Sequence, residues 1–245
     1  MHVVCGRYAL SKDPSALAVE FGTQEPAERL VPDYNIAPTK RSYIVVDRRS
    51  DADVLERSLE AARWGLVPRW AKDAGIGSRM ANARAETVAE KPSFRSAFAK
   101  RRCLVPADGY YEWYLPSAAP VGTKPVKQPF FIHRADEHSL ALAGLYEWWR
   151  DPGVPTEDPA SWLLTFTIIT TAATDDLARI HDRMPMSVAQ GDWDAWLDPG
   201  VIGQDATALM SPRGSGELTA YPVATAVNSV RNNGATLIEP LAATS

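Results

Sequence analysis

The chain has few cysteines and few histidines, and this scarcity narrows its chemistry. Its 245 residues include 2 cysteines, Cys5 and Cys103, and 4 histidines. Two cysteines do not form the framework of a disulfide-rich fold. No histidine has metal-ligand spacing to a cysteine. We therefore expect neither a disulfide-stapled scaffold nor a metal site.

Long apolar runs are also missing. No segment is long and apolar enough to span a bilayer, and the first residues lack a basic and apolar signal pattern. These absences predict a cytoplasmic protein with no membrane contact. The 45% hydrophobic content supports a substantial core. We expect a single domain over residues 1–245, and a monomer as the simplest assembly.

Acidic residues exceed basic ones, but the basic residues are clustered. The net charge is −4, whereas residues 63–102 contain ten Lys or Arg and three acids, which gives +7 locally and −11 elsewhere. A confined basic region suits binding of a phosphate backbone. A solvated helix face would produce the same pattern, so charge alone leaves both interpretations open.

Strand patterns outnumber helix patterns along the chain. We expect helices at 11–21, 92–101, 174–180 and 190–197. We expect strands at 42–47, 55–64, 102–106, 109–114, 129–133, 140–145, 162–171 and 218–227. Residues 34–39 and 115–128 read as loops, and the last residues as frayed. Without regular βαβ alternation, the order favours an α+β fold with a mainly antiparallel sheet.

Four polar residues stand in unusual surroundings. Cys5 opens Cys-Gly-Arg-Tyr, Asn82 opens Asn-Ala-Arg-Ala-Glu-Thr, Glu112 interrupts an aromatic strand pattern, and His181 follows a predicted helix. Taken singly, each has an ordinary structural explanation: a small buried residue, a loop amide, a solvent-facing acid and a helix-end imidazole.

Seven segments together resemble one family. They are Cys-Gly-Arg-Tyr (5–8), Tyr-Asn-Ile-Ala-Pro (34–38), Trp-Gly-Leu-Val-Pro (64–68), Asn-Ala-Arg-Ala-Glu-Thr (82–87), Gly-Tyr-Tyr-Glu-Trp (109–113), Gln-Pro-Phe-Phe-Ile (128–132) and Ile-His-Asp-Arg-Met-Pro (180–185). In this order and spacing they resemble the SRAP family, the SOS response-associated peptidases or abasic-site processing proteins. The resemblance runs from Cys5 to about Trp196, and residues from about 228 to 245 match weakly.

The resemblance implies a fold and an activity. The fold is a single SRAP-like domain with a curved, mainly antiparallel sheet and short flanking helices. The activity is the sensing of abasic sites in single-stranded DNA and at junctions with duplex, within the DNA damage (SOS) response. An N-terminal cysteine forms a thiazolidine with the ring-opened sugar aldehyde and shields the lesion. The reaction releases only water, so it needs no cofactor.

The resemblance and the side-chain chemistry together assign catalytic roles. Cys5 supplies the amine and the thiol, and His181 exchanges protons at the sugar because its pKa lies near neutrality. Glu112 moves the proton of the amine, since an apolar strand would raise its pKa. Asn82 orients the amine or a sugar oxygen.

The remaining expected site residues bind DNA. By resemblance, Arg7, Arg84 and Arg183 hold phosphates, Asn35 and Pro38 line the cleft, and Thr170 lies near the sugar. Trp70 and Trp113 can stack on flanking bases, although core packing would explain either tryptophan equally well. Arg95 is a further candidate DNA contact within the basic region.

Met1–Val4 precede Cys5, and with them attached no thiazolidine can form. Three explanations stay open: translation starts at Val4, the chain removes its own leader, or the protein binds DNA without covalent capture. A self-cleaving cysteine peptidase and a noncovalent reader of damaged or modified DNA are accordingly the alternative functions. Reversal of the adduct and AP lyase cleavage are also open.

Overall fold

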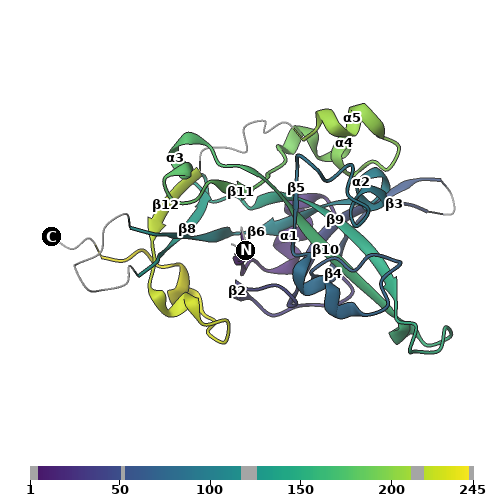
Figure 1. Cartoon of the computed structure of the whole chain (residues 1–245), viewed down its shortest axis with the longest axis horizontal. Helices are drawn as coiled ribbons and strands as arrows, with labels where there is room; N and C mark the ends of the chain where they lie inside the picture. Colours follow the sequence, from purple (N-terminus) through teal and green to yellow (C-terminus); the bar gives the residue numbers. More distant parts are fainter. Residues whose placement is uncertain (1–4, 51–52, 117–125, 211–217, 243–245) are drawn as a thin grey trace.

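The computed structural model describes residues 5–50, 53–116, 126–210 and 218–242 (Figure 1). Its α-helices are α1 (Pro14–Phe21), α2 (Arg95–Lys100), α3 (Asp175–Ala178), α4 (Trp193–Leu197) and α5 (Gly203–Ala208). Its strands are β1 (Tyr8–Leu10), β2 (Asp33–Ile36), β3 (Arg41–Arg49), β4 (Leu55–Trp64), β5 (Asn82–Arg84), β6 (Arg102–Ala107), β7 (Gly109–Tyr114), β8 (Gln128–Arg134), β9 (Leu140–Arg150), β10 (Trp162–Ala172), β11 (Arg183–Pro185) and β12 (Leu218–Pro222). This composition confirms the α+β class.

One sheet has five antiparallel strands in the order β12-β8-β7-β1-β2. In this sheet β1 pairs with β7 so that Tyr8 faces Tyr110 and Ala9 faces Gly109. No side chain fits at Gly109, because a Cβ atom at this position would lie 2.4 Å from a ring carbon of Phe131. This close approach fixes β7, which carries Glu112, against β8.

The second sheet has seven strands and closes on itself. Strands β10, β4, β3, β6 and β9 form a continuous circuit, because β10 pairs with β4 on one side and with β9 on the other. The β10–β4 and β10–β5 pairings are parallel, and the other pairings are antiparallel. The prediction of mainly antiparallel pairing is therefore confirmed, with the strands divided between two sheets.

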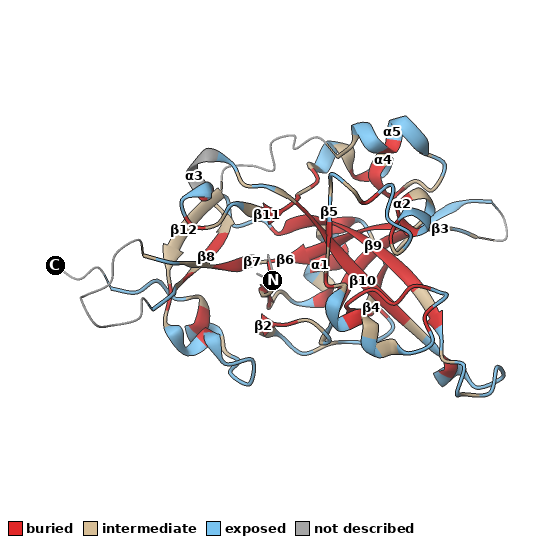
Figure 2. Ribbon diagram, viewed as in Figure 1, coloured by how far each residue is buried: buried red, intermediate tan, exposed pale blue. Residues whose placement is uncertain are grey.

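The closed circuit surrounds most of the core (Figure 2). β9 is almost continuously buried from Leu140 to Trp149, as expected for a strand covered on both faces. Cys103 on β6 belongs to this core, and its Sγ lies 2.8 Å from where a Cβ on Gly144 would stand. Its role in the structure is packing.

Several elements differ from the sequence prediction. Residues 34–39, predicted as a loop, begin within β2, and the last predicted strand ends at Pro222 and is followed by a 3₁₀ turn at Thr225–Asn228. α2 begins at Arg95, after turns at 92–94, and α3 is a single turn preceded by Thr174. The predicted loop at 115–128 lies mostly outside the described residues, and within them β8 begins at Gln128.

The chain after β12 is packed as far as Leu241, and the last residues, 243–245, which were predicted to be frayed, lie outside the described residues. Val223, Val227 and Leu237 form a small core with residues of β1, β7 and β8. The backbone nitrogen of Leu241 donates to the carbonyl of Pro222. The yellow segment that follows β12 in Figure 1 therefore packs against β1, β7 and β8 of the five-stranded sheet, at the end of the molecule away from α4 and α5. No helix in the described parts of the chain is long and apolar enough to cross a membrane.

Candidate functional site

Cys5 lies where the two sheets meet and is hydrogen-bonded to both. Its backbone nitrogen donates to Glu112 Oε1 over 2.6 Å, and Glu112 belongs to β7 of the five-stranded sheet. Its carbonyl oxygen accepts from Asn82 Nδ2 over 3.2 Å, and Asn82 begins β5 of the seven-stranded sheet. Three of the four expected catalytic residues are thus in direct contact.

Glu112 is a buried acid on β7. It is 3% exposed. Burial raises its pKa to about 7, partly offset by the backbone N–H groups of Cys5 and Trp113. The carboxylate of Asp182 raises that pKa further, so the segment beside His181 faces this side of the site. A carboxyl with a pKa of about 7 can both accept and return a proton at neutral pH.

Cys5 itself is buried and has an unusual backbone conformation. Its φ is 46°, in the left-handed region that residues other than glycine seldom adopt. Burial raises the pKa of its thiol well above 9.0, and the charge of Glu112 adds to this rise. The sulfur is therefore a neutral thiol at neutral pH and needs a base when it reacts. A strained cysteine beside a carboxyl of near-neutral pKa is typical of a functional site.

His181 is near the site but does not bond to its centre. Its Nδ1 accepts the backbone N–H of Arg183 over 3.1 Å, and Asp182 Oδ1 lies 3.0 Å from the same nitrogen. Both contacts are made by Nδ1, so this nitrogen lies between a backbone N–H and a carboxylate. Among the described residues no hydrogen bond joins His181 to Cys5 or Glu112.

Arg183 and Thr170 interact across neighbouring strands. Arg183 Nη2 donates to the carbonyl of Thr170 over 2.6 Å and to its hydroxyl over 3.2 Å. Thr170 is 1% exposed, so the structure uses its hydroxyl to hold Arg183. Arg84 pairs with Thr170 in the parallel β5–β10 ladder and is exposed. The two arginines therefore flank the same position on β10.

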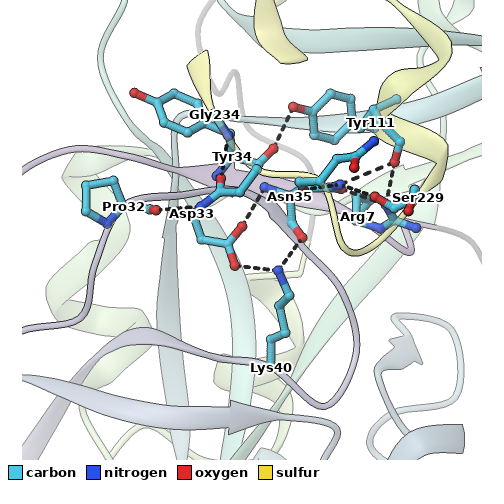
Figure 3. Close-up of polar contacts among 12 residues, drawn as sticks. Arg7, Pro32, Asp33, Tyr34, Asn35, Lys40, Tyr111, Ser229 and Gly234 are labelled. Atoms are coloured by element: carbon cyan, nitrogen blue, oxygen red, sulfur yellow. Dashed lines mark hydrogen bonds and ion pairs between the residues drawn. The ribbon is translucent and has the colours of Figure 1, made fainter. Parts of the chain in front are cut away.

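Arg7 and Asn35 join β1 and β2 to the C-terminal segment (Figure 3). Asn35 is fully buried, and its Nδ2 donates to the carbonyls of Val227, Ser229 and Asn232. Its Oδ1 accepts from Arg7 Nη1 over 2.6 Å, and that nitrogen also donates to the carbonyl of Val227. Burial lowers the pKa of Arg7. In this structure both side chains hold the segment 225–233 beside the site.

The two candidate tryptophans have different environments. Trp113 is half-buried: its Nε1 donates to Asn228 Oδ1 over 2.7 Å, and the Arg7 guanidinium lies 5.7 Å from its ring centre. Trp70 is 61% exposed, on the loop between β4 and β5. Trp113 thus has a fixed orientation, whereas Trp70 is open to solvent.

The other candidate DNA contacts are accessible. Arg95 is exposed at the start of α2, and Pro38 is half-buried in the β2–β3 connection. The basic region as a whole is less available than its charge suggests. Arg102 is 2% exposed and donates to the carbonyls of Trp196 and Phe98. Arg101 pairs with the buried Glu147. Arg101 and Arg102, two of the ten basic residues of this region, therefore serve the fold.

Comparison with known proteins is consistent with this geometry. The model of the SOS response associated peptidase (SRAP) family matches residues 4–230. The chain belongs to the SRAP family. Abasic site processing protein YoqW of Bacillus subtilis (strain 168) is 37% identical over 240 residues, which cover 96% of this chain and 99% of that protein. Abasic site processing protein HMCES of Gallus gallus is 34% identical over 243 residues, which cover 87% of this chain and 67% of HMCES.

Solved structures share the fold. An X-ray crystal structure of a protein from Bacteroides thetaiotaomicron superposes with a TM-score of 0.80 at 27% identity, covering 97% of this chain and 100% of that one. The SRAP match extends to residue 230 and so includes most of the C-terminal segment that Asn35 holds.

Sequence reasoning missed two features of the site. One is the C-terminal turn, for which the run of asparagines ending in Asn233-Gly234 was an available turn signal. The other is Glu86, whose carboxylate pairs with Arg183. Within Asn-Ala-Arg-Ala-Glu-Thr it is an ordinary acid, and its partner lies 97 residues away.

Proposed function

We propose that this SRAP-family chain processes abasic sites in DNA by covalent capture through Cys5. The observation that carries the proposal is the 2.6 Å contact between the Cys5 nitrogen and the buried carboxyl of Glu112. The names of the YoqW and HMCES relatives support the same substrate class. The family match begins at residue 4, so it includes Cys5.

The capture reaction requires that the Cys5 nitrogen be a free amine. Glu112 takes a proton from this amine, and the neutral amine adds to the sugar aldehyde. The protonated carboxyl then returns the proton to the departing hydroxyl, which leaves as water, and the carboxylate takes the remaining N–H proton to leave a neutral imine. The thiol adds to the imine carbon and its proton moves to the nitrogen, which closes the thiazolidine. One water is lost overall, and no oxidant or cofactor takes part.

The surrounding residues position the reactants. Asn82 holds the Cys5 carbonyl and thereby fixes the direction of the nitrogen and sulfur. His181 is the proposed proton donor for opening of the closed sugar. Arg84 and Arg183 would bind the phosphates beside the lesion, and the open face of Trp70 would stack on a neighbouring base. Single-stranded DNA and its junctions with duplex are the proposed substrates.

One experiment tests the capture. A chain initiated at Cys5 is incubated with single-stranded oligonucleotides that contain or lack one abasic site, followed by denaturing electrophoresis. We expect a heat-stable shifted band only with the lesion. Cys5→Ala should abolish the band, whereas Cys103→Ala, the matched change of a core thiol, should retain it. Retention of the band in Cys5→Ala would contradict the proposal.

Self-cleavage is a second candidate because the same contact favours it. The Cys5 nitrogen is also the leaving atom of the Val4–Cys5 peptide bond, and Glu112 lies within proton-transfer distance of it. Attack of the Cys5 sulfur on the Val4 carbonyl would give a thioester and a free amine, and water would then release residues 1–4. Intact mass measurement of the protein from its own host decides: a mature chain that begins at Met1 contradicts both self-cleavage and covalent capture.

A further inference from the structure

A carboxylate occupies the binding fork of Arg183. Glu86 Oε1 lies 2.6 Å from Arg183 Nη1, and Glu86 Oε2 lies 3.1 Å from Nη2. Two parallel contacts of this kind are the way in which guanidinium groups bind both carboxylates and phosphates. Glu86 thus fills the position in which a phosphate of bound DNA would bind Arg183.

The two partners differ in how firmly the fold holds them. The Arg183 side chain is 13% exposed and is also bonded to Thr170, whereas the Glu86 side chain is 53% exposed. Glu86 follows β5 in a turn, so its side chain can rotate into solvent without disturbing a sheet. The arginine is fixed and the carboxylate is the part that can leave.

Arg84 adds a second positive charge near this position. It pairs with Thr170 on β10, opposite the strand that carries Arg183. The charges of Arg183 and Arg84 both lower the pKa of the Glu86 carboxyl, which is therefore ionised at neutral pH. The site thus contains two arginines and one internal anion.

We propose that Glu86 acts as an internal substitute for a DNA phosphate, so that DNA must displace it from Arg183 in order to bind. This inference rests on the proposed function, because it assumes that Arg183 binds DNA. Displacement exchanges one ion pair for another, and the released Glu86 stays near the bound phosphate as a like charge. Glu86 therefore weakens DNA binding and makes it less sensitive to salt.

The opposite role, in which Glu86 only supports Arg183, predicts the opposite sign. Removing a support would leave Arg183 less well oriented, and DNA binding would weaken. Removing a competitor would strengthen it. The direction of the change therefore decides between the two roles.

The test is Glu86→Gln, measured as affinity for a single-stranded oligonucleotide with one tetrahydrofuran abasic analogue, between about 50 and 200 mM salt. This analogue has no aldehyde and cannot be captured. We expect about fivefold tighter binding, from the removal of one like charge about 4 Å from a phosphate in water. The slope of log K against log salt should steepen by about 0.7, the contribution of one phosphate contact in single-stranded DNA.

Two variants serve as controls. Glu90→Gln removes an exposed acid from the same turn region without touching Arg183, and its effect should stay below about twofold. In an Arg183→Gln background, Glu86→Gln should have no further effect. Weaker binding by Glu86→Gln, or an unchanged salt slope, would overturn the inference.

The outcomes separate this inference from the proposed capture. If Glu86→Gln binds the analogue more tightly but the Cys5-initiated chain forms no cross-link, only covalent capture fails. If the cross-link forms and Glu86→Gln changes nothing, only the role of Glu86 fails. Absence of any DNA binding by the unmodified chain would overturn both.

Discussion

Replacement of Glu112 by glutamine tests the environment of the site without any DNA. Glutamine has the shape of glutamate and its Oε1 can still accept from the Cys5 nitrogen. Burial raises the pKa of Glu112 from 4.5 to about 7, so the folded protein favours the protonated acid. At 1.36 kcal/mol per pH unit, this difference corresponds to about 3 kcal/mol.

The sign of the effect follows from the direction of the pKa change. A carboxyl whose pKa is raised by folding contributes its full stability below its unfolded pKa, here 4.5, and loses it as pH rises through the folded value of about 7. Glutamine does not titrate. The free energy of unfolding of Glu112→Gln minus that of the unmodified chain should therefore increase by about 3 kcal/mol between pH 4.5 and pH 8.

Urea unfolding of the full-length chain over this pH range measures the difference, since other titrating groups are common to both proteins and cancel. Glu86→Gln is the control that should stay nearly flat over this range: Arg183 lowers the pKa of Glu86 from 4.5, so its stabilisation is present above the unfolded pKa and is lost only as pH falls below about 4.5. That change should stay below about 1 kcal/mol for an exposed ion pair. A pH-independent difference for Glu112→Gln would refute the argument that burial places this acid near neutrality.

Two further substitutions test the surroundings of the site. Asn35→Ala removes the donor to three carbonyls of the C-terminal segment and should lower the free energy of unfolding by about 2–3 kcal/mol, measured by urea unfolding. The control is Asn228→Ala, which loses one exposed contact with Trp113. It should lower the free energy of unfolding by less than about 1 kcal/mol. Equal losses would contradict the anchoring role of Asn35. Trp70→Ala should leave stability unchanged and weaken binding of single-stranded DNA by about 1–3 kcal/mol, measured by fluorescence anisotropy. Trp162→Ala, at another exposed tryptophan, should affect neither, and equal binding by both variants would exclude stacking on Trp70.

The long strands were predictable because their apolar and aromatic residues form patterns that are typical of strands. β4, β7 and β10 begin within one residue of the positions that apolar and aromatic patterns indicate. The short strands β5 and β11 were not predictable, because three residues are too few to show a periodic pattern. They are strands because each pairs with an edge of β10. β2 was not predicted for a similar reason: its one buried polar residue, Asn35, is bonded to carbonyl groups of a distant segment.

The residues of the candidate site also divide into those that local sequence predicts and those that depend on distant partners. Cys5, Asn82 and Glu112 were found by motif, and the structure places them in contact. The environments of Arg7 and Asn35 were not predictable, because their partners are backbone carbonyls near residue 230. Every residue has a backbone carbonyl, so the sequence does not indicate which of them will accept a hydrogen bond. Motifs indicate which side chains matter, but the backbone groups that position them appear only once the chain has folded.

The position of Cys5 between two sheets suggests why the site needs both. Its nitrogen is bonded to Glu112 of one sheet and its carbonyl to Asn82 of the other, so the two sheets together fix a residue that belongs to no strand. The proposed capture of an aldehyde by two atoms of Cys5 needs those atoms held in a single orientation. A relative shift of the sheets would separate Glu112 from Asn82 and so remove this orientation, even with every side chain intact.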